Sequence, residues 1–170
     1  GSSMKPLSVV APGIDSGKIT AASVFDDVPY KNYKNYNYFK GLLTIRYAIE
    51  SSQNIPMLKA IQVVGVDNSL KFLKSLGFSH LDDEKDNNIG IALGGLTNGA
   101  TPLEMAAAYG AIANDGVYIE PTFYTKVVDG NGNTVFEPKQ ESRTVMSASA
   151  AYVVKEVLTQ PVKSGTSTTL

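Results

Sequence analysis

The sequence contains no cysteine and only one histidine, His80. The absence of cysteine excludes disulfide bonds, thiol catalysis and thiolate metal sites. A single imidazole excludes a metal site with two or more histidines and leaves at most one imidazole base. His80 follows Gly77 just after an expected helix, where a solvated loop position is the better interpretation. We therefore expect any serine nucleophile in this chain to be deprotonated by a lysine.

Strong net charge and long apolar runs are also missing. Fifteen basic and sixteen acidic side chains give a net charge of −1, and no basic tract could follow a phosphate backbone, which argues against a nucleic-acid partner. No apolar run approaches the length of about 20 residues that spans a bilayer, so an anchor or signal peptide would have to lie outside the printed residues. With 43% hydrophobic and 18% charged residues, the 170 residues predict one ordered domain or part of one.

The first six residues, GSSMKP, place Ser2 three positions before Lys5 at an expected helix N-terminus. Positions i and i+3 share a helix face, so the hydroxyl and the ammonium can meet in one site. The unpaired N–H groups of a first turn would favour an alkoxide or oxyanion, and Pro6 is tolerated there. Gly-Ser-Ser before a methionine is also what an expression tag leaves behind, so these residues have a second interpretation.

Most of the chain reads as helix. The apolar stretch 7–14 predicts a short buried helix that Pro12 and Gly13 bend or end. Thr44, Asn54 and Asp67 can each cap a further helix, and the very short turns between these three helices require close packing. Residues 23–40 show neither helical nor strand periodicity and predict a tyrosine-rich loop. Surface packing is the favoured role of its tyrosines, with groove walls as the alternative.

The second half begins with the clearest local signal, TPLEMAAAYGAIANDG. Thr101 and Glu104 form a capping box and Gly116 ends the helix, whose many alanines predict a place at the centre of the helical packing. A β-hairpin is predicted over residues 117–137 around DGNGN. Ser147 then caps a last helix that runs to Pro161.

A further polar triplet, Ser52-Gln53-Asn54, falls in the break between two predicted helices, where side chains project from a turn. From the residues alone, the better explanation is structural: Asn54 caps the following helix and Ser52 ends the preceding one.

The chain resembles the transpeptidase domain of penicillin-binding proteins, most closely the class A, bifunctional type. GSSMKPLSVVAPGIDSGKIT is similar to that family's segment beginning at the acylated serine, and IRYAIESSQNIPMLKAIQVVGVD to its S-x-N stretch. SVFDDVPY resembles the loop after the serine, and ALGGLTNGATPLEMAAAYGAIANDGVYIEP the family's most recognisable helix and following strand. The likeness covers nearly all of residues 1–170, which we therefore interpret as a partial transpeptidase domain.

This resemblance implies a fold that is mainly α with one β-hairpin. It would be the helical lobe of the α+β serine penicillin-recognising fold, shared with DD-peptidases and β-lactamases, with the central sheet largely missing from this chain. It implies no cofactor and no metal. The implied catalytic residues are Ser2 as nucleophile, Lys5 as base, Ser52 as proton relay, and Asn54 holding both the lysine and a substrate amide.

The resemblance also implies a peptidoglycan DD-transpeptidase that crosslinks stem peptides ending in D-Ala-D-Ala and is acylated by β-lactam antibiotics. Its setting would be the extracytoplasmic face of a bacterial cell membrane, with an anchor and a glycosyltransferase domain outside these residues. The family completes its site with a K-[ST]-G triplet on a strand. Lys163-Ser164-Gly165 spells that triplet, but no β-branched or aromatic run surrounds it, which favours a linker. The remainder of the domain, carrying the true strand, is then an expected partner.

Two other functions remain open at this point. A serine β-lactamase would share Ser2 and Lys5 but needs a base that activates water, for which Glu50 and Glu104 are the nearest candidates. Glu104 is better explained by the capping box, and Glu50 as an exposed residue in the last turn of a helix. A non-catalytic module that senses penicillin would be acylated without exchanging stem peptides.

Overall fold

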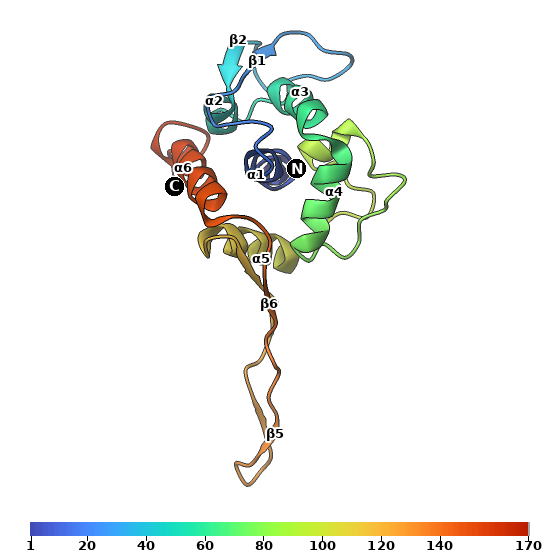
Figure 1. Cartoon of the computed structure of the whole chain (residues 1–170), viewed down its shortest axis with the longest axis vertical. Helices are drawn as coiled ribbons and strands as arrows, with labels where there is room; N and C mark the ends of the chain where they lie inside the picture. Colours follow the sequence, from blue (N-terminus) through green and yellow to red (C-terminus); the bar gives the residue numbers. More distant parts are fainter. Residues whose placement is uncertain (170) are drawn as a thin grey trace.

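A helical segment at the N-terminus forms the centre of the protein. The computed structural model describes residues 1–169, and Figure 1 shows this segment surrounded by the other helices. It consists of a 3₁₀ turn over Ser2–Met4, a π-helical turn over Pro6–Val10 and helix α1 over Ala11–Asp15. Its apolar side chains from Leu7 to Ala11 are completely buried, as the apolar stretch predicted.

The helix does not end at Pro12 or Gly13, because it continues through both to Asp15. Pro12 is the second residue of α1, which directly follows the π-helical turn. A Cβ on Gly13 would lie 2.6 Å from Ile19 and 2.7 Å from Val64. Gly13 therefore permits close packing of the central helix and does not end it.

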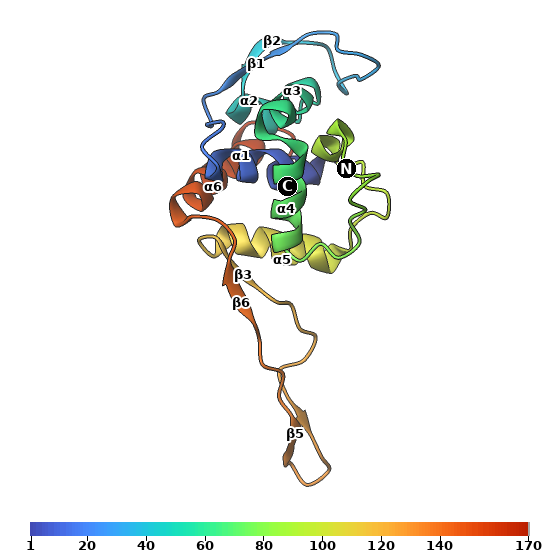
Figure 2. The same cartoon turned by 45° about the vertical axis from the view of Figure 1, so that its right-hand side comes forward.

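Five helices surround the central segment (Figures 1 and 2). Three of them begin at a predicted capping side chain, and in two of these Thr44 accepts a hydrogen bond from Tyr47 N and Ser147 accepts one from Ala150 N. The capping box between Thr101 and Glu104 is also present. The helices are α2 (Ile45–Glu50), α3 (Ile55–Val64), α4 (Val66–Ser75), α5 (Pro102–Ala113) and α6 (Ala148–Lys163), with a 3₁₀ turn at Ile89–Leu93.

The place of helix α5 and the start of helix α4 also differ from the expectations. Helix α5 does not occupy the centre: only Ala108, Ala111 and Ile112 are buried, and it lies across one end of the bundle in Figure 2. The alanine-rich sequence of α5 has no clearly polar face, and such a face would have marked it as an outer helix. Helix α4 begins after Gly65, whose φ of 91° suits glycine, and Asp67 lies in the first turn instead of at the cap.

The region predicted as a loop over residues 23–40 contains a strand. Strand β1 (Val24–Asp27) pairs antiparallel with β2 (Gly41–Thr44), in a register that sets Asp27 opposite Gly41. This four-residue strand gives too short a pattern for periodicity to detect. The pairing fixes both ends of the intervening loop, residues 28–40.

The predicted reversal at Asp129 lies at the tip of a long arm that leaves the helical body in Figures 1 and 2. Asp129 Oδ1 accepts hydrogen bonds from Asn131 N and Asn133 N, both 2.9 Å, which closes the turn. The arm extends beyond the predicted 117–137, because its base pairs β3 with a strand after residue 137. The ladders are β3 (Val117–Ile119) with β6 (Ser142–Thr144), and β4 (Val127–Val128) with β5 (Thr134–Phe136).

Helix α6 continues past Pro161, and Lys163 is its last residue. Ser164 occupies the C-cap, so Lys163-Ser164-Gly165 is not on a strand, in agreement with the linker interpretation. All sheets within residues 1–169 are two-stranded, as expected for a helical lobe without a central sheet. Over the same residues, no helix is both long and apolar enough to cross a membrane.

Candidate active site

Ser2, Lys5 and Ser52 meet at one point, although Ser52 is 47 residues from Lys5 in the chain. Lys5 Nζ lies 3.0 Å from Ser2 Oγ, 3.0 Å from Ser52 Oγ and 2.7 Å from the Ser52 carbonyl oxygen. The central helical segment supplies Ser2 and Lys5 one turn apart, and the turn between α2 and α3 supplies Ser52. The structure therefore brings together three of the four residues predicted for the site.

Lys5 is 1% exposed, which is unusual for a lysine. Among the described residues its hydrogen-bond partners are two hydroxyls and one backbone carbonyl, and none of them carries a negative charge. Burial disfavours the ammonium and lowers the pKa of Lys5 from 10.5 to about 8. Near neutral pH a useful fraction of this amine is therefore unprotonated and able to accept a proton.

Ser52 adopts the left-handed conformation, with φ of 54°. It follows the C-cap of α2, where Ser52 N donates to Ile49 O at 3.1 Å and Gln53 N donates to Ala48 O at 2.8 Å. These two bonds form a Schellman motif, in which the left-handed residue is usually glycine. The backbone conformation directs the Ser52 carbonyl to Lys5 Nζ. The Ser52 hydroxyl adds a second contact to the same Nζ, which a glycine could not make.

Asn54 is the fourth predicted residue, and it is not among the hydrogen-bond partners of Lys5 in residues 1–169. Its Nδ2 donates to the Lys34 carbonyl at 2.7 Å. Asn54 occupies the N-cap position of α3 but its side chain makes no capping bond. Asn54 does line the same pocket as Ser2 and Ser52, so it borders the space beside Ser2.

That pocket has a volume of about 300 Å³. Four of its lining residues were missed by sequence reasoning, namely Tyr36, Asn37, Ser51 and Thr166. The tyrosine-rich composition of residues 28–40 was a usable signal, since groove walls were the alternative role for these tyrosines. The full lining consists of Ser2, Tyr36, Asn37, Ser51, Ser52, Gln53, Asn54 and Thr166.

Thr166 reaches the pocket because the chain after α6 folds back onto the end of α2. Thr166 N donates to the Glu50 carbonyl at 3.2 Å, and a Cβ on Gly165 would collide with that same oxygen. Glycine at position 165 thus allows the approach that brings Thr166 to the site.

Tyr109 on α5 supports the turn that carries the candidate nucleophile. Its hydroxyl donates to the Ser3 carbonyl at 2.7 Å. Burial raises the pKa of Tyr109 to about 12, so the phenol remains a donor over the whole physiological range. The contact fixes the 3₁₀ turn next to Ser2.

The two glutamates considered as water-activating bases do not line the pocket. Burial raises the pKa of Glu104, but hydrogen bonds from Ser79 and Thr101 outweigh it and hold this pKa at about 2. His80 is a solvated loop residue, as predicted, and its side chain contacts Ser79. Within residues 1–169 no group of three or more histidine, aspartate or glutamate side chains could hold a metal ion.

Comparison with known proteins agrees with this geometry. The family model described as "Penicillin binding protein transpeptidase domain" matches residues 1–170. Penicillin-binding protein 1A of Clostridium botulinum is 35% identical over 98% of this chain. The chain spans only 22% of that relative.

Solved structures give the same result for the fold. The D,D-transpeptidase domain of a peptidoglycan glycosyltransferase from Eggerthella lenta superimposes with a TM-score of 0.81 at 25% identity, covering 99% of this chain and 49% of that one. Penicillin-binding protein 3 of Mycobacterium tuberculosis, in complex with aztreonam, gives a TM-score of 0.81 at 22% identity, covering 95% of this chain and 41% of that one.

The fold and the family match define a penicillin-binding transpeptidase domain, and the chain belongs to that family. The 1A relatives place it with the class A members. Its helices are part of the transpeptidase fold, in agreement with the fold expected from sequence.

Proposed function

We propose that this chain carries the nucleophile, base and proton relay of a peptidoglycan DD-transpeptidase, with Ser2 as the residue that is acylated. The single observation that supports this most strongly is the position of the buried Lys5 amine, 3.0 Å from both serine hydroxyls. A lysine in place of histidine requires a depressed pKa, and burial supplies it here.

In the proposed reaction the neutral Lys5 amine accepts the proton of Ser2 Oγ while this oxygen attacks the penultimate carbonyl of a stem peptide ending in D-Ala-D-Ala. The C–N bond to the terminal residue breaks, and the proton passes from Lys5 through Ser52 Oγ to the leaving amine, which departs as D-alanine. An amine of a neighbouring peptidoglycan strand then attacks the ester carbonyl and gives a proton to Lys5. Lys5 passes this proton to Ser2 Oγ as the ester C–O bond breaks, so both residues return to their starting states. Asn54 orients a substrate amide, having both a donor and an acceptor.

A β-lactam would react with the same residues. Ser2 attacks the ring carbonyl, the ring C–N bond opens, and the leaving nitrogen stays tethered to the acyl group. The M. tuberculosis relative in complex with aztreonam supports this class of ligand for the fold. The Glu104 carboxylate is engaged by Ser79 and Thr101, which favours a long-lived acyl-enzyme over rapid hydrolysis by a β-lactamase.

The rest of the site is proposed to come from outside these residues. The family's K-[ST]-G strand would supply the substrate carboxylate contact and oxyanion-hole donors, and losing one such donor costs roughly 10²–10³ in rate. An apolar groove of about 570 Å³ between α5 and α6, lined by Tyr109, Ile112 and Leu158, offers a surface for the remainder of the domain. We place the whole protein at the extracytoplasmic face of a bacterial cell membrane, with a separate anchor and a glycosyltransferase domain.

The test is to incubate the full-length protein with a labelled penicillin and to locate the adduct by mass spectrometry. We expect covalent mass on the peptide that contains Ser2, and none in the Ser2→Ala variant. Label on another residue would overturn the assignment of Ser2. Absence of label on folded wild-type protein would overturn the function.

A further inference from the structure

Helix α3, which follows the Ser52–Asn54 turn, is capped by a residue from a distant loop. Asn54 has helical φ and ψ of −86° and −46°, whereas a residue that caps with its own side chain is usually extended. Instead, Asn35 Oδ1 accepts hydrogen bonds from Asn54 N at 2.8 Å and Ile55 N at 3.2 Å. Two otherwise unpaired N–H groups of the helix N-terminus are thereby satisfied by a side chain 19 and 20 residues away.

The orientation of the Asn35 amide is set by Asp27. Asn35 Nδ2 donates to Asp27 Oδ1 at 2.7 Å, and Asp27 Oδ2 accepts from Lys40 N at 3.0 Å. Because Asp27 is completely buried and its carboxylate can only accept, the nitrogen of Asn35 must face it and the oxygen must face α3. The three groups therefore form a chain of fixed polarity from strand β1 to the active-site turn.

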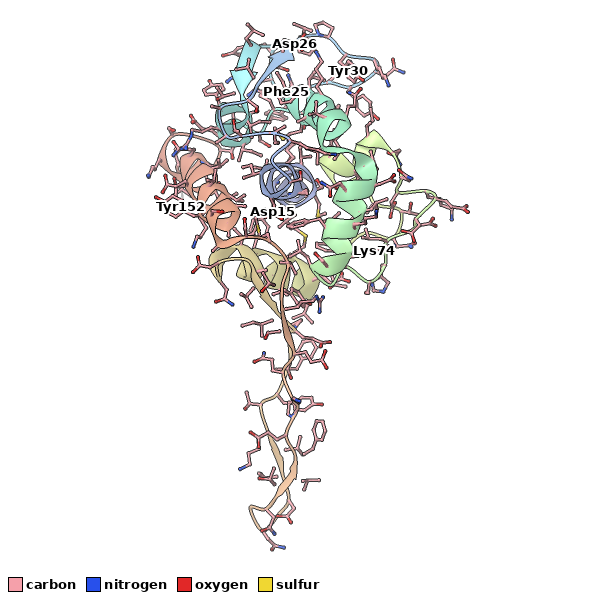
Figure 3. The ribbon with its side chains drawn as sticks, in the orientation of Figure 1. Asp15, Phe25, Asp26, Tyr30, Lys74 and Tyr152 are labelled. Carbon is pink, nitrogen blue, oxygen red and sulfur yellow. The ribbon has the colours of Figure 1, made fainter. Side chains whose placement is uncertain are left out.

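Strand β1 is itself fastened to α3. Asp26, next to Asp27, pairs with Lys59 at 2.6 Å, and Lys59 also lies 5.5 Å from the ring of Tyr30. Figure 3 shows Asp26 and Tyr30 on the segment that passes beside α3. The base of the Asn35 loop is thus in direct contact with the helix that Asn35 caps.

The consequence for the site follows from the neighbours of Asn35. Lys34 uses its carbonyl to hold Asn54 Nδ2, and Tyr36 lines the pocket. Since Asn35 does the capping, the Asn54 side chain is released from that role, and its Oδ1 accepts no hydrogen bond from the described residues. The end of the turn at α2 is held by the Schellman motif, and its end at α3 by Asn35.

We propose that Asn35, oriented by Asp27, is a positioning residue that sets Ser52 and Asn54 relative to Lys5. This inference rests on the proposed function. Asn35 itself touches neither Ser2 nor Lys5 in the hydrogen-bond network of residues 1–169. It acts through the turn, and a displacement of about 1 Å in such a turn can slow a reaction about 10²-fold.

The test is an exchange of the two side chains in the full-length protein. Asn35→Asp alone places two carboxylates in contact with each other. Asp27→Asn alone leaves one N–H donor facing another N–H donor, whichever way the two amides are turned. In the double variant, the new carboxylate at position 35 accepts from α3 and from the new amide at position 27, whose oxygen accepts from Lys40 N. We expect each single variant to lower the rate constant of acylation by labelled penicillin by about 10- to 100-fold. The double variant should return to within about threefold of wild type.

The matched control is Ser147→Ala, which removes the cap of α6 at the end of that helix remote from Thr166 and the pocket. It should lower the melting temperature while leaving acylation of the folded protein unchanged. The inference is overturned if folded single variants acylate as fast as wild type, if the exchange fails to restore the rate, or if Ser147→Ala slows acylation equally. If folded wild-type protein is not labelled by penicillin at all, the proposed function is overturned, and this inference with it.

Discussion

Ser52 combines a backbone conformation that disfavours serine with a hydroxyl that lies 3.0 Å from the Lys5 amine. A non-glycine residue in the left-handed region costs about 1 kcal/mol or more. Glycine would remove that cost and would leave the carbonyl contact to Lys5 intact. The serine is therefore retained at the expense of stability, which is typical of strained residues at functional sites.

The variant Ser52→Gly should raise the free energy of unfolding by about 1 kcal/mol. It should also slow acylation by about 10²-fold, because the relay hydroxyl is lost. Chemical denaturation and the rate of labelling by penicillin measure the two effects. Ser52→Ala is the control, since it loses the hydroxyl but keeps the strain, and it should slow acylation without any gain in stability. Equal stability of the two variants would contradict the prediction.

The pKa of Lys5 leads to a second prediction at this scale. If neutral Lys5 is the base, the acylation rate should rise with pH and level off above about 8. Stopped-flow labelling across that range measures the profile. A flat profile would exclude Lys5 as the group that accepts the proton.

Stability gives an independent check on the same lysine. Its folded-state pKa of about 8 lies below the ordinary lysine value of 10.5, so between these limits the unfolded chain binds more protons than the folded one. The free energy of unfolding contributed by Lys5 therefore rises as the pH increases through that window. Lys5→Met should lack this rise when the two proteins are unfolded by denaturant.

At the scale of elements, local signals predicted what local interactions decide. The capping box of α5 needs only Thr101 and Glu104, which are three residues apart, and it formed as expected. The position of α5 in the bundle depends on what packs against it, and its alanine-rich sequence does not indicate which face of the helix is buried. Strand β1 was missed for a similar reason, since its partner β2 begins 14 residues after β1 ends.

The same distinction applies to the site. Ser2 and Lys5 were predicted from a spacing of three residues, and Ser52 from its place in a helix break and from the family resemblance. Asn35 and Thr166 carry no local signal, because their roles arise from contacts with α3 and with the end of α2. Such residues become visible only when the chain is folded.

The arm illustrates an element with two unequal parts. At its base Tyr118 is buried, and Arg143 donates to the Ser75 carbonyl at 2.9 Å and stacks on the Tyr118 ring. Toward the tip, Phe123 is 85% exposed and all of β5 is exposed. The base therefore belongs to the body of the protein and the tip does not.

Replacing residues 123–139 by a short Asn-Gly turn should change the free energy of unfolding by less than about 0.5 kcal/mol, since the tip buries little apolar surface. Tyr118→Ala, at the base, should instead cost about 3 kcal/mol. Thermal or denaturant unfolding measures both. A large loss on shortening the arm would show that its tip supports the body.

At the scale of the whole molecule, the candidate base belongs to the most deeply enclosed segment, and the candidate nucleophile lies at the exposed N-terminal end of that segment. The five surrounding helices pack around this segment, so the residues that hold Lys5 away from water are also the residues of the core. Tertiary packing, more than helix propensity, then keeps these short turns helical.

This placement ties chemistry to cooperativity. A catalytic loop at the surface can melt early and leave its scaffold intact, but the burial of Lys5 inside a helical bundle is lost only when the bundle itself unfolds. Reactivity toward penicillin should therefore persist almost to the midpoint of denaturation and vanish in the same transition as the helical signal.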